Sequence, residues 1–249
     1  MKEFAKILYG SQNYGLAGPD SDKDYKLLLC PTFEDLYNYH KVDKHDVPSK
    51  YDEHYSPMSI MQFNRLLLDG NPNCLEMLFS LESESNVPQM LPYIEMARGL
   101  FKRRYIALVW DKFYSALQGI ALNSIDRNGI SGKTVSRACY FYGLMEYIVQ
   151  TGFVVDEKTW RHMSPNFHGY TQDIRFGDHT IYYLELLTEQ AKNNFANYKQ
   201  TAHDAAQAFI DRRPGIVHDL QNDAQRLENY VQAIVAQSVW EELNPCFSH

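Results

Sequence analysis

Two short apolar runs, separated by a polar turn, open the chain. The first covers residues 4–9 and ends at Gly10, and the second covers about residues 23–30 and ends at Pro31. Short apolar runs that end at glycine or proline are typical of β-strands. Three glycines between residues 10 and 19 predict a turn between these strands, with room for one helical turn at residues 13–16.

A third strand and a helix are predicted next. Residues 50–55 fit a strand, and Ser56 and Pro57 suit the N-cap and the first turn of a helix. Apolar residues then follow helical spacing from residue 60 to about residue 68. The turn sequence at residues 69–72 (DGNP) ends this helix.

From about residue 88 the pattern changes to long helical periods. The candidate helices cover residues 90–101, 105–124, 133–150, 180–198 and 216–242. The last helix has a seam of apolar residues at alternating steps of three and four: Val217, Leu220, Ala224, Leu227, Val231 and Ile234. This seam favours packing within the chain, and a homodimer through the C-terminal helix is the alternative. Strands followed by helices predict an α+β fold.

Charge and composition narrow the function. The chain has 24 Lys and Arg against 31 Asp and Glu, a formal net charge of −7. This charge argues against extended, sequence-independent binding of nucleic acid, which depends on many contacts of Lys and Arg with phosphates. It does not argue against binding of a nucleotide or an RNA end. We find no secretion signal and no run of the roughly 20 apolar residues that span a membrane, and the scattered cysteines predict free thiols. We therefore expect a cytoplasmic protein with no membrane partner.

Candidate chemistry lies at the start of the second strand. Asp22 and Asp24 are two residues apart, so on a strand their carboxylates point to the same side. Neighbouring carboxylates repel unless a cation lies between them, and Mg²⁺ takes oxygen ligands that it shares with substrate phosphates. Gly10 and Ser11 offer backbone N–H groups and a hydroxyl that can hold a phosphate. The alternative is an ordinary turn, since Pro-Asp-Ser-Asp is a common turn composition.

Gly-Ser followed about ten residues later by Asp-x-Asp resembles the DNA polymerase beta-like nucleotidyltransferase superfamily. The fuller string, GSQNYGL at residues 10–16 and PDSDKD at residues 19–24, is similar to a branch of predicted nucleotidyltransferases that includes RNA-ligase-associated proteins. The sequence NPNCLE at residues 71–76 matches the same branch. The resemblance implies a polymerase-beta-type domain, a small mixed sheet with flanking helices, over residues 1–95, and a helical domain over residues 96–249.

The resemblance also implies a third carboxylate, which is Asp52 or Glu53. These two face opposite ways on a strand, and Asp52 is favoured because the superfamily usually places an aspartate there. In the helical region it implies a phosphate or acceptor contact from Lys133, with Arg137 and Arg175 as further candidates. Relatives often carry histidine one turn after the lysine, where this chain has Arg137, so the substrate-facing side of this region differs.

The implied activity is the transfer of a nucleoside monophosphate from an NTP to an acceptor hydroxyl. Asp22, Asp24 and Asp52 would hold two Mg²⁺ ions, and Asp52 could also act as general base. The NTP would be bound by Gly10, Ser11, Tyr14, Lys133 and Arg137. An RNA end, a tRNA, a small molecule and a protein hydroxyl all stay open as acceptors. Alternatives are a non-catalytic accessory protein that binds a nucleotide or RNA, and a structural protein organised by its C-terminal helix.

Overall fold

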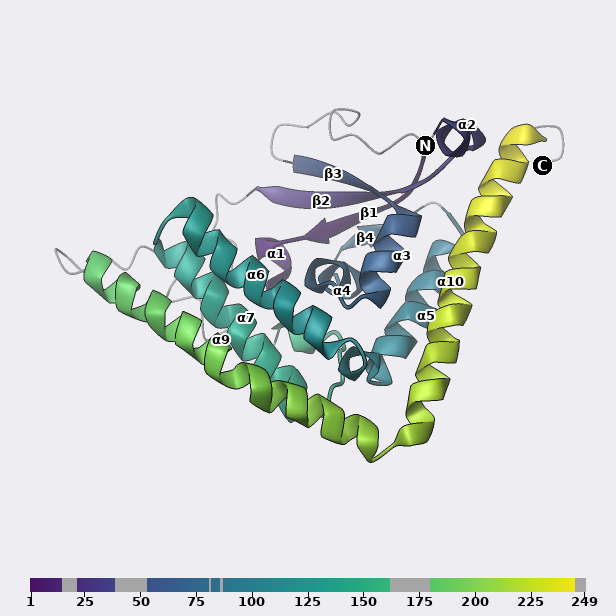
Figure 1. Ribbon diagram of the computed structural model, residues 1–249. Coiled ribbons are helices and arrows are strands. Elements are labelled where there is room, and N and C mark those ends of the chain that lie inside the picture. Colours follow the sequence, from purple (N-terminus) through teal and green to yellow (C-terminus); the bar gives the residue numbers. More distant parts are fainter. Residues whose placement is uncertain (15–21, 39–52, 81, 86, 162–179, 245–249) are drawn as a thin grey trace.

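The structure combines a small sheet with long helices in an α+β arrangement (Figure 1). It is a computed structural model that describes residues 1–14, 22–38, 53–80, 82–85, 87–161 and 180–244. The strands are β1 (Lys2–Tyr9), β2 (Lys23–Cys30), β3 (Glu53–Ser59) and β4 (Ser83–Glu84). The α+β class and the small mixed sheet with flanking helices, both expected from the sequence, are confirmed.

The sheet has the strand order β3-β2-β1-β4. β1 pairs antiparallel with β2 and β4, whereas β2 pairs parallel with β3. A parallel pair requires a crossover from one end of the sheet to the other. Of that crossover the structure describes α2 (Phe33–Tyr37), whose N-cap Thr32 accepts a hydrogen bond from the N–H of Asp35 through its side chain.

One face of the sheet carries the hydrophobic core. Ile7 of β1 and Leu28 and Cys30 of β2 are buried in it. Two helices, α3 (Ile60–Leu68) and α4 (Pro72–Leu78), pack against this part of the sheet (Figure 1). α4 begins with a capped first turn, because the Asn71 side chain accepts hydrogen bonds from two backbone N–H groups of this turn. The chain therefore turns sharply between α3 and α4 and keeps both against the sheet.

The helix after the third strand begins later than predicted. Ser56 and Pro57 belong to β3, where they pair with Lys26 and Leu27 of β2, and the N-cap of α3 is Ser59. β3 is an edge strand of the described sheet, and an edge strand tolerates proline because one side of its backbone needs no sheet partner. The capping signal at Ser56 was therefore overridden by pairing with β2.

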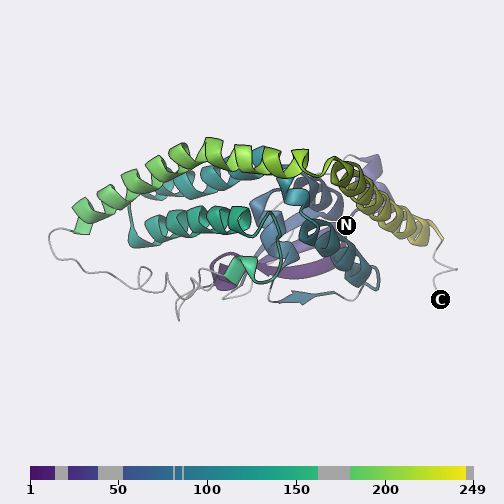
Figure 2. The ribbon, with the colours of Figure 1, turned by 90° about the horizontal axis from the view of Figure 1, so that it is seen from below.

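The rest of the chain is helical. The main helices are α5 (Met90–Lys102), α6 (Trp110–Asn128), α7 (Gly132–Gln150), α9 (Thr180–Asp211) and α10 (Pro214–Leu243). α6, α7 and α9 pack together, while α10 packs against α5 and α3 (Figure 1). Figure 2 shows α9 and α10 one after the other along one edge of the molecule. None of the described helices is both long and apolar enough to cross a membrane.

The apolar seam of α10 is buried inside the chain. Leu220, Leu227, Val231 and Ile234 all belong to the hydrophobic core. This confirms intramolecular packing of most of the seam, whose other two members, Val217 and Ala224, are half-buried. The same core includes residues of the sheet, and α5 crosses the expected domain boundary between residues 95 and 96. The division into two domains stays a prediction.

Candidate functional site

The chain leaves β1 through a sharp turn at Gly10. Its φ of 85° lies in the left-handed region, which glycine adopts without a steric penalty. The N–H of Asn13 donates to the Gly10 carbonyl at 3.0 Å and closes the single turn α1 (Ser11–Tyr14). A Cβ added at Gly10 would lie 3.4 Å from Oδ2 of Asp24. The Gly-Ser pair and the second aspartate of the motif are therefore neighbours in space.

The two aspartates lie where β2 begins. Asp24 pairs with Tyr9 of β1 on one side and with His54 of β3 on the other, and its side chain is half-buried. Asp22 comes directly before the strand and is exposed, and its Oδ2 lies 3.3 Å from Nε2 of His54. His54 thus joins the two aspartates at the same end of the sheet. A protonated His54 would form an ion pair with Asp22.

Glu76 of α4 holds the turn from the core side. Its side chain is buried, and its Oε1 accepts hydrogen bonds from the N–H of Gly10 at 2.5 Å and from Nδ2 of Asn13 at 3.0 Å. Nδ2 of Asn13 also donates to the Leu8 carbonyl at 2.8 Å. The turn beside Asp24 is therefore fixed at both of its ends by one carboxylate.

Tyr9 and Arg137 complete this environment. The pKa of Tyr9 is raised to about 12, chiefly by burial and also by the negative charges of Asp24 and Glu76, while the positive charge of Arg137 opposes the rise. The charges of Asp24 and of Arg137 on α7 thus act on the same phenol in opposite directions. Nε of Arg137 is buried without a hydrogen-bond partner among the described residues, and its Cζ lies 5.6 Å from the centre of the Phe141 ring.

Three other residues of the predicted NTP site lie in α1 and α7. Lys133 is exposed in the first turn of α7, one turn before Arg137, and the structure gives it no contact with the aspartates among the described residues. Ser11 begins α1 directly after Gly10 and is half-buried. Tyr14 ends α1, and its side chain is outside the described part of the structure.

Of the two candidates for the third carboxylate, the structure describes only Glu53. Asp52 and Arg175 lie outside the described residues. Glu53 begins β3 and pairs with Lys23, one position out of phase with Asp24 and its partner His54. In the segments that the structure describes, no three His, Cys, Asp or Glu side chains form a group that could hold a metal ion. The preference for Asp52 over Glu53 stays a prediction.

Two members of the site were not assigned a role by the motif. Tyr9 precedes Gly10 and pairs with Asp24. The alternation of side-chain directions along β1 was the sequence signal that could have identified Tyr9. Lys26 follows Asp24 on the same strand face, with Nζ 2.6 Å from Oγ of Ser56 and 5.0 Å from the centre of the Tyr9 ring. A lysine within an apolar run was the signal that a polar environment begins there.

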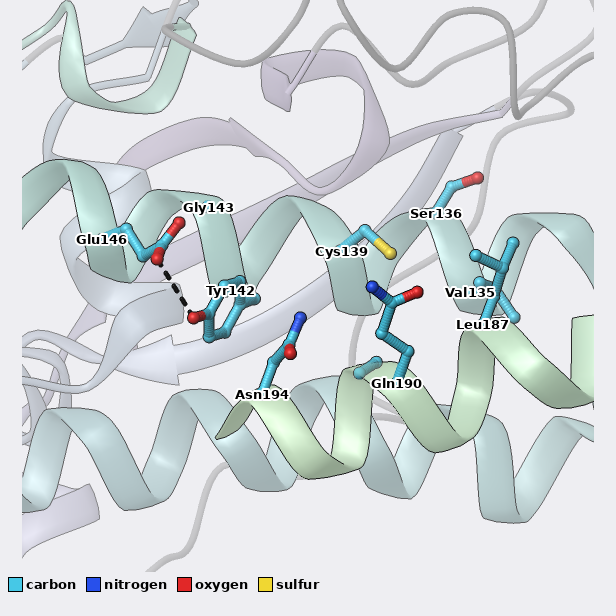
Figure 3. Close-up of a pocket in the computed structure, with 10 residues that line it drawn as sticks. Val135, Ser136, Cys139, Tyr142, Gly143, Glu146, Leu187, Gln190 and Asn194 are labelled. Carbon is cyan, nitrogen blue, oxygen red and sulfur yellow. Dashed lines mark hydrogen bonds between the residues drawn. The ribbon is translucent and has the colours of Figure 1, made fainter. Parts of the chain in front are cut away.

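A separate cavity of about 240 Å³ lies between α7 and α9 (Figure 3). Cys139 of α7 and Gln190 and Asn194 of α9 face each other across it, and the Tyr142 hydroxyl donates to Glu146 at its edge at 3.0 Å. None of the residues that the motif predicts lines this cavity. It is therefore distinct from the site around Asp24.

Comparison with known proteins identifies no relative of this chain. The chain matches no protein-family model, no curated protein and no solved structure. The resemblance to the polymerase beta-like superfamily therefore rests on the sequence motifs at residues 10–24 and 71–76, and it stays a prediction.

Proposed function

We propose that this protein is a Mg²⁺-dependent nucleotidyltransferase of the DNA polymerase beta-like kind. It would transfer a nucleoside monophosphate from an NTP to an acceptor hydroxyl and release pyrophosphate. The observation that carries the proposal is the close approach of Gly10 to Asp24, where a Cβ added at Gly10 would lie 3.4 Å from Oδ2 of Asp24. This proximity brings the Gly-Ser pair of the motif beside its acidic pair, which a chance match of two short motifs would not require.

The aspartates suit a hard divalent cation. Carboxylate oxygens are ligands that Mg²⁺ prefers, and Mg²⁺ usually keeps several waters beside one or two carboxylates. Asp24 is half-buried and Asp22 is exposed, so this end of the sheet offers two carboxylates with access to water. Bound Mg²⁺ would neutralise the triphosphate and lower the pKa of the acceptor hydroxyl. Asp52 stays the predicted third ligand and general base.

The triphosphate would be held by donors around Gly10. The N–H of Gly10 is already engaged by Glu76, so Gly10 contributes the shape of the turn, and the donor role falls to Ser11. Arg137 is the cation best placed to help, because a half-buried guanidinium with an unpaired Nε is stabilised by a phosphate oxygen. Phosphoryl transfer depends mainly on such positioning and charge neutralisation.

The reaction would be a displacement at the α-phosphorus. The acceptor oxygen forms a bond to the α-phosphorus, the bond between this phosphorus and the oxygen bridging to the β-phosphate breaks, and pyrophosphate leaves. The acceptor proton passes to a carboxylate, with Asp52 as the predicted one, or to water. An RNA end, a tRNA, a small molecule and a protein hydroxyl remain the candidate acceptors.

Transfer of label tests the proposal. The protein is incubated with Mg²⁺ and NTPs labelled in either the α- or the γ-phosphate, together with total RNA, small-molecule extract or protein extract. The proposal expects α-label on an acceptor and γ-label in pyrophosphate, and both should vanish in Asp22→Ala/Asp24→Ala. A matched control is Asp126→Ala/Asp219→Ala, which removes two exposed carboxylates from α6 and α10.

Other outcomes would favour other functions. Binding of an NTP without any transfer of label would support a non-catalytic accessory protein. Transfer that survives in Asp22→Ala/Asp24→Ala would show that the two aspartates are not the catalytic pair.

A further inference from the structure

Glu76 is the one buried acidic side chain among the described residues, with 1% of its surface exposed. Burying a carboxylate is costly unless hydrogen bonds or a cation compensate for the lost water. The rest of α4 is apolar where it is buried, with Leu75, Met77 and Leu78 in the core. An apolar side chain at position 76 would therefore suit the packing of α4 better than a carboxylate does.

The hydrogen bonds of Glu76 explain why a carboxylate is there. Its Oε1 accepts from the N–H of Gly10 at 2.5 Å and from Nδ2 of Asn13 at 3.0 Å. Gly10 directly precedes α1 and Asn13 lies within it, and both are more than sixty positions before Glu76 in the chain. One oxygen atom of α4 thus connects the two ends of the turn that carries Ser11.

The fixed turn lies beside Asp24. Gly10 has a φ of 85°, and a Cβ at this position would meet Oδ2 of Asp24 at 3.4 Å. A small rotation of the turn would change the position of Ser11 relative to the Asp24 carboxylate. The side chain that holds Gly10 therefore also sets the distance between the phosphate donors and the predicted metal ligands.

We infer that Glu76 is a positioning residue for the triphosphate of the bound nucleotide, acting through Gly10 and Asn13 without touching the substrate. This inference rests on the proposed function. Ser11 would contact the β- and γ-phosphates of the NTP, and the Glu76 carboxylate fixes the turn that carries Ser11. Glu76 should therefore affect binding of these two phosphates and not of the α-phosphate.

The test compares an NTP with the corresponding nucleoside monophosphate. Binding of each, with Mg²⁺, is measured by calorimetry for the full chain and for Glu76→Met, Glu76→Gln and Asn64→Leu. In metal sites, residues that hold the direct ligands in place typically contribute about 10–100-fold to affinity, and we take the same scale for a residue that holds a phosphate contact in place. We expect Glu76→Met to weaken NTP binding by at least about tenfold and to leave monophosphate binding within about twofold.

The two other variants serve as controls. Glu76→Gln keeps an oxygen that can accept both hydrogen bonds, so it should bind the NTP nearly as wild type does. Asn64 is also a buried polar residue, and it accepts a hydrogen bond from Tyr93 on α5. Asn64→Leu should lower thermal stability without changing the ratio of the two affinities.

Hydrogen exchange in the wild-type protein gives a second readout in case Glu76→Met does not fold. The amide of Gly10 should exchange slowly without ligand, in contrast to the exposed turn glycine Gly129. Asn13→Ala, which removes one of the two hydrogen bonds to Glu76, should speed exchange at Gly10 and weaken NTP binding selectively.

Four results would overturn the inference. Unchanged NTP binding in Glu76→Met, or an equal loss of NTP and monophosphate binding, would reduce Glu76 to a structural role. Fast exchange of the wild-type Gly10 amide would contradict the fixed turn. These three results leave the proposed function intact. If wild type binds no NTP at all, the proposed function fails and this inference fails with it.

Discussion

Tyr9 and Asp24 lie directly opposite each other in the antiparallel ladder of β1 and β2. Tyr9 packs against the hydrophobic core, and its neighbour Gly10 lies beside the Asp24 carboxylate, 3.4 Å from which a Cβ at Gly10 would lie. A half-buried phenol, a half-buried carboxylate and a glycine with positive φ therefore meet at the end of two strands. Because the side chains are so close, a change in the charge of one should be measurable at another.

The pKa of Tyr9 gives the first prediction. It is raised from 10.0 to about 12 by burial first and by the charge of Asp24 second. A raised pKa means that Tyr9 stabilises the fold fully below pH 10 and that this contribution is lost as the pH rises through about 12. The free energy of unfolding should therefore fall more steeply in this window in wild type than in Tyr9→Phe. Asp24→Asn should lower the pKa of Tyr9, measured by NMR of its ring carbons, and an unchanged value would contradict the placement.

Gly10 and Gly129 form a matched pair for the second prediction. Both have a positive φ, but a Cβ at Gly129 meets nothing within 4 Å, whereas one at Gly10 meets Asp24. Alanine at either position should destabilise the fold by about 1–2 kcal/mol, because L-residues avoid the left-handed region. Only Gly10→Ala should also weaken binding of Mg²⁺ and NTP. Equal ligand affinities in the two variants would show that the Gly10 turn is not part of the site.

The third prediction concerns Arg137. A charge-assisted hydrogen bond contributes about 1.5–3 kcal/mol, so Arg137→Gln should weaken NTP binding by about 10–100-fold. Thermal stability should change little, because this guanidinium forms no ion pair with another described residue. The control is Arg226→Gln, which removes an exposed arginine paired only with Asp223 on its own helix. Calorimetry measures the NTP affinity of both variants. Equal affinities of Arg137→Gln and Arg226→Gln would show that Arg137 is not part of the site.

The fourth prediction concerns α10. Leu227 is buried in the core with 1% exposed surface, and Leu243 of the same helix is 56% exposed. Leu227→Ala should cost about 2–5 kcal/mol of stability, the usual range for a buried leucine, and Leu243→Ala should cost little. Urea unfolding measures both. A midpoint that shifts with protein concentration in wild type, and no longer does so in Leu227→Ala, would instead favour the homodimer.

Local signals in the sequence were enough for several elements. The first two apolar runs correspond to β1 and β2, and the helix predicted from residue 133 to residue 150 is α7. In each case a glycine, proline or capping residue next to a regular apolar pattern marks the boundary. α9 was predicted too short, since it continues to Asp211 with Ala202 and Ala206 buried along it, and alanine is a weak marker of a buried face.

Contacts between distant segments were not predictable in this way. β4 consists of Ser83 and Glu84, two polar residues that form a strand only because β1 offers a partner. The hydrogen bond from Gly10 to Glu76 likewise depends on the packing of α4 against β1. The motif therefore located the aspartates and the Gly-Ser turn, while the residues that hold them in place required the structure.

The most direct test of the central proposal is calorimetric titration of each NTP into wild type and Asp22→Ala/Asp24→Ala, with and without Mg²⁺. The proposed site predicts that wild type binds at least one NTP only when Mg²⁺ is present and that the double variant, folded as wild type by circular dichroism, does not. Binding that is absent in wild type, independent of Mg²⁺, or equal in the two proteins would contradict a nucleotide–metal site at Asp22 and Asp24.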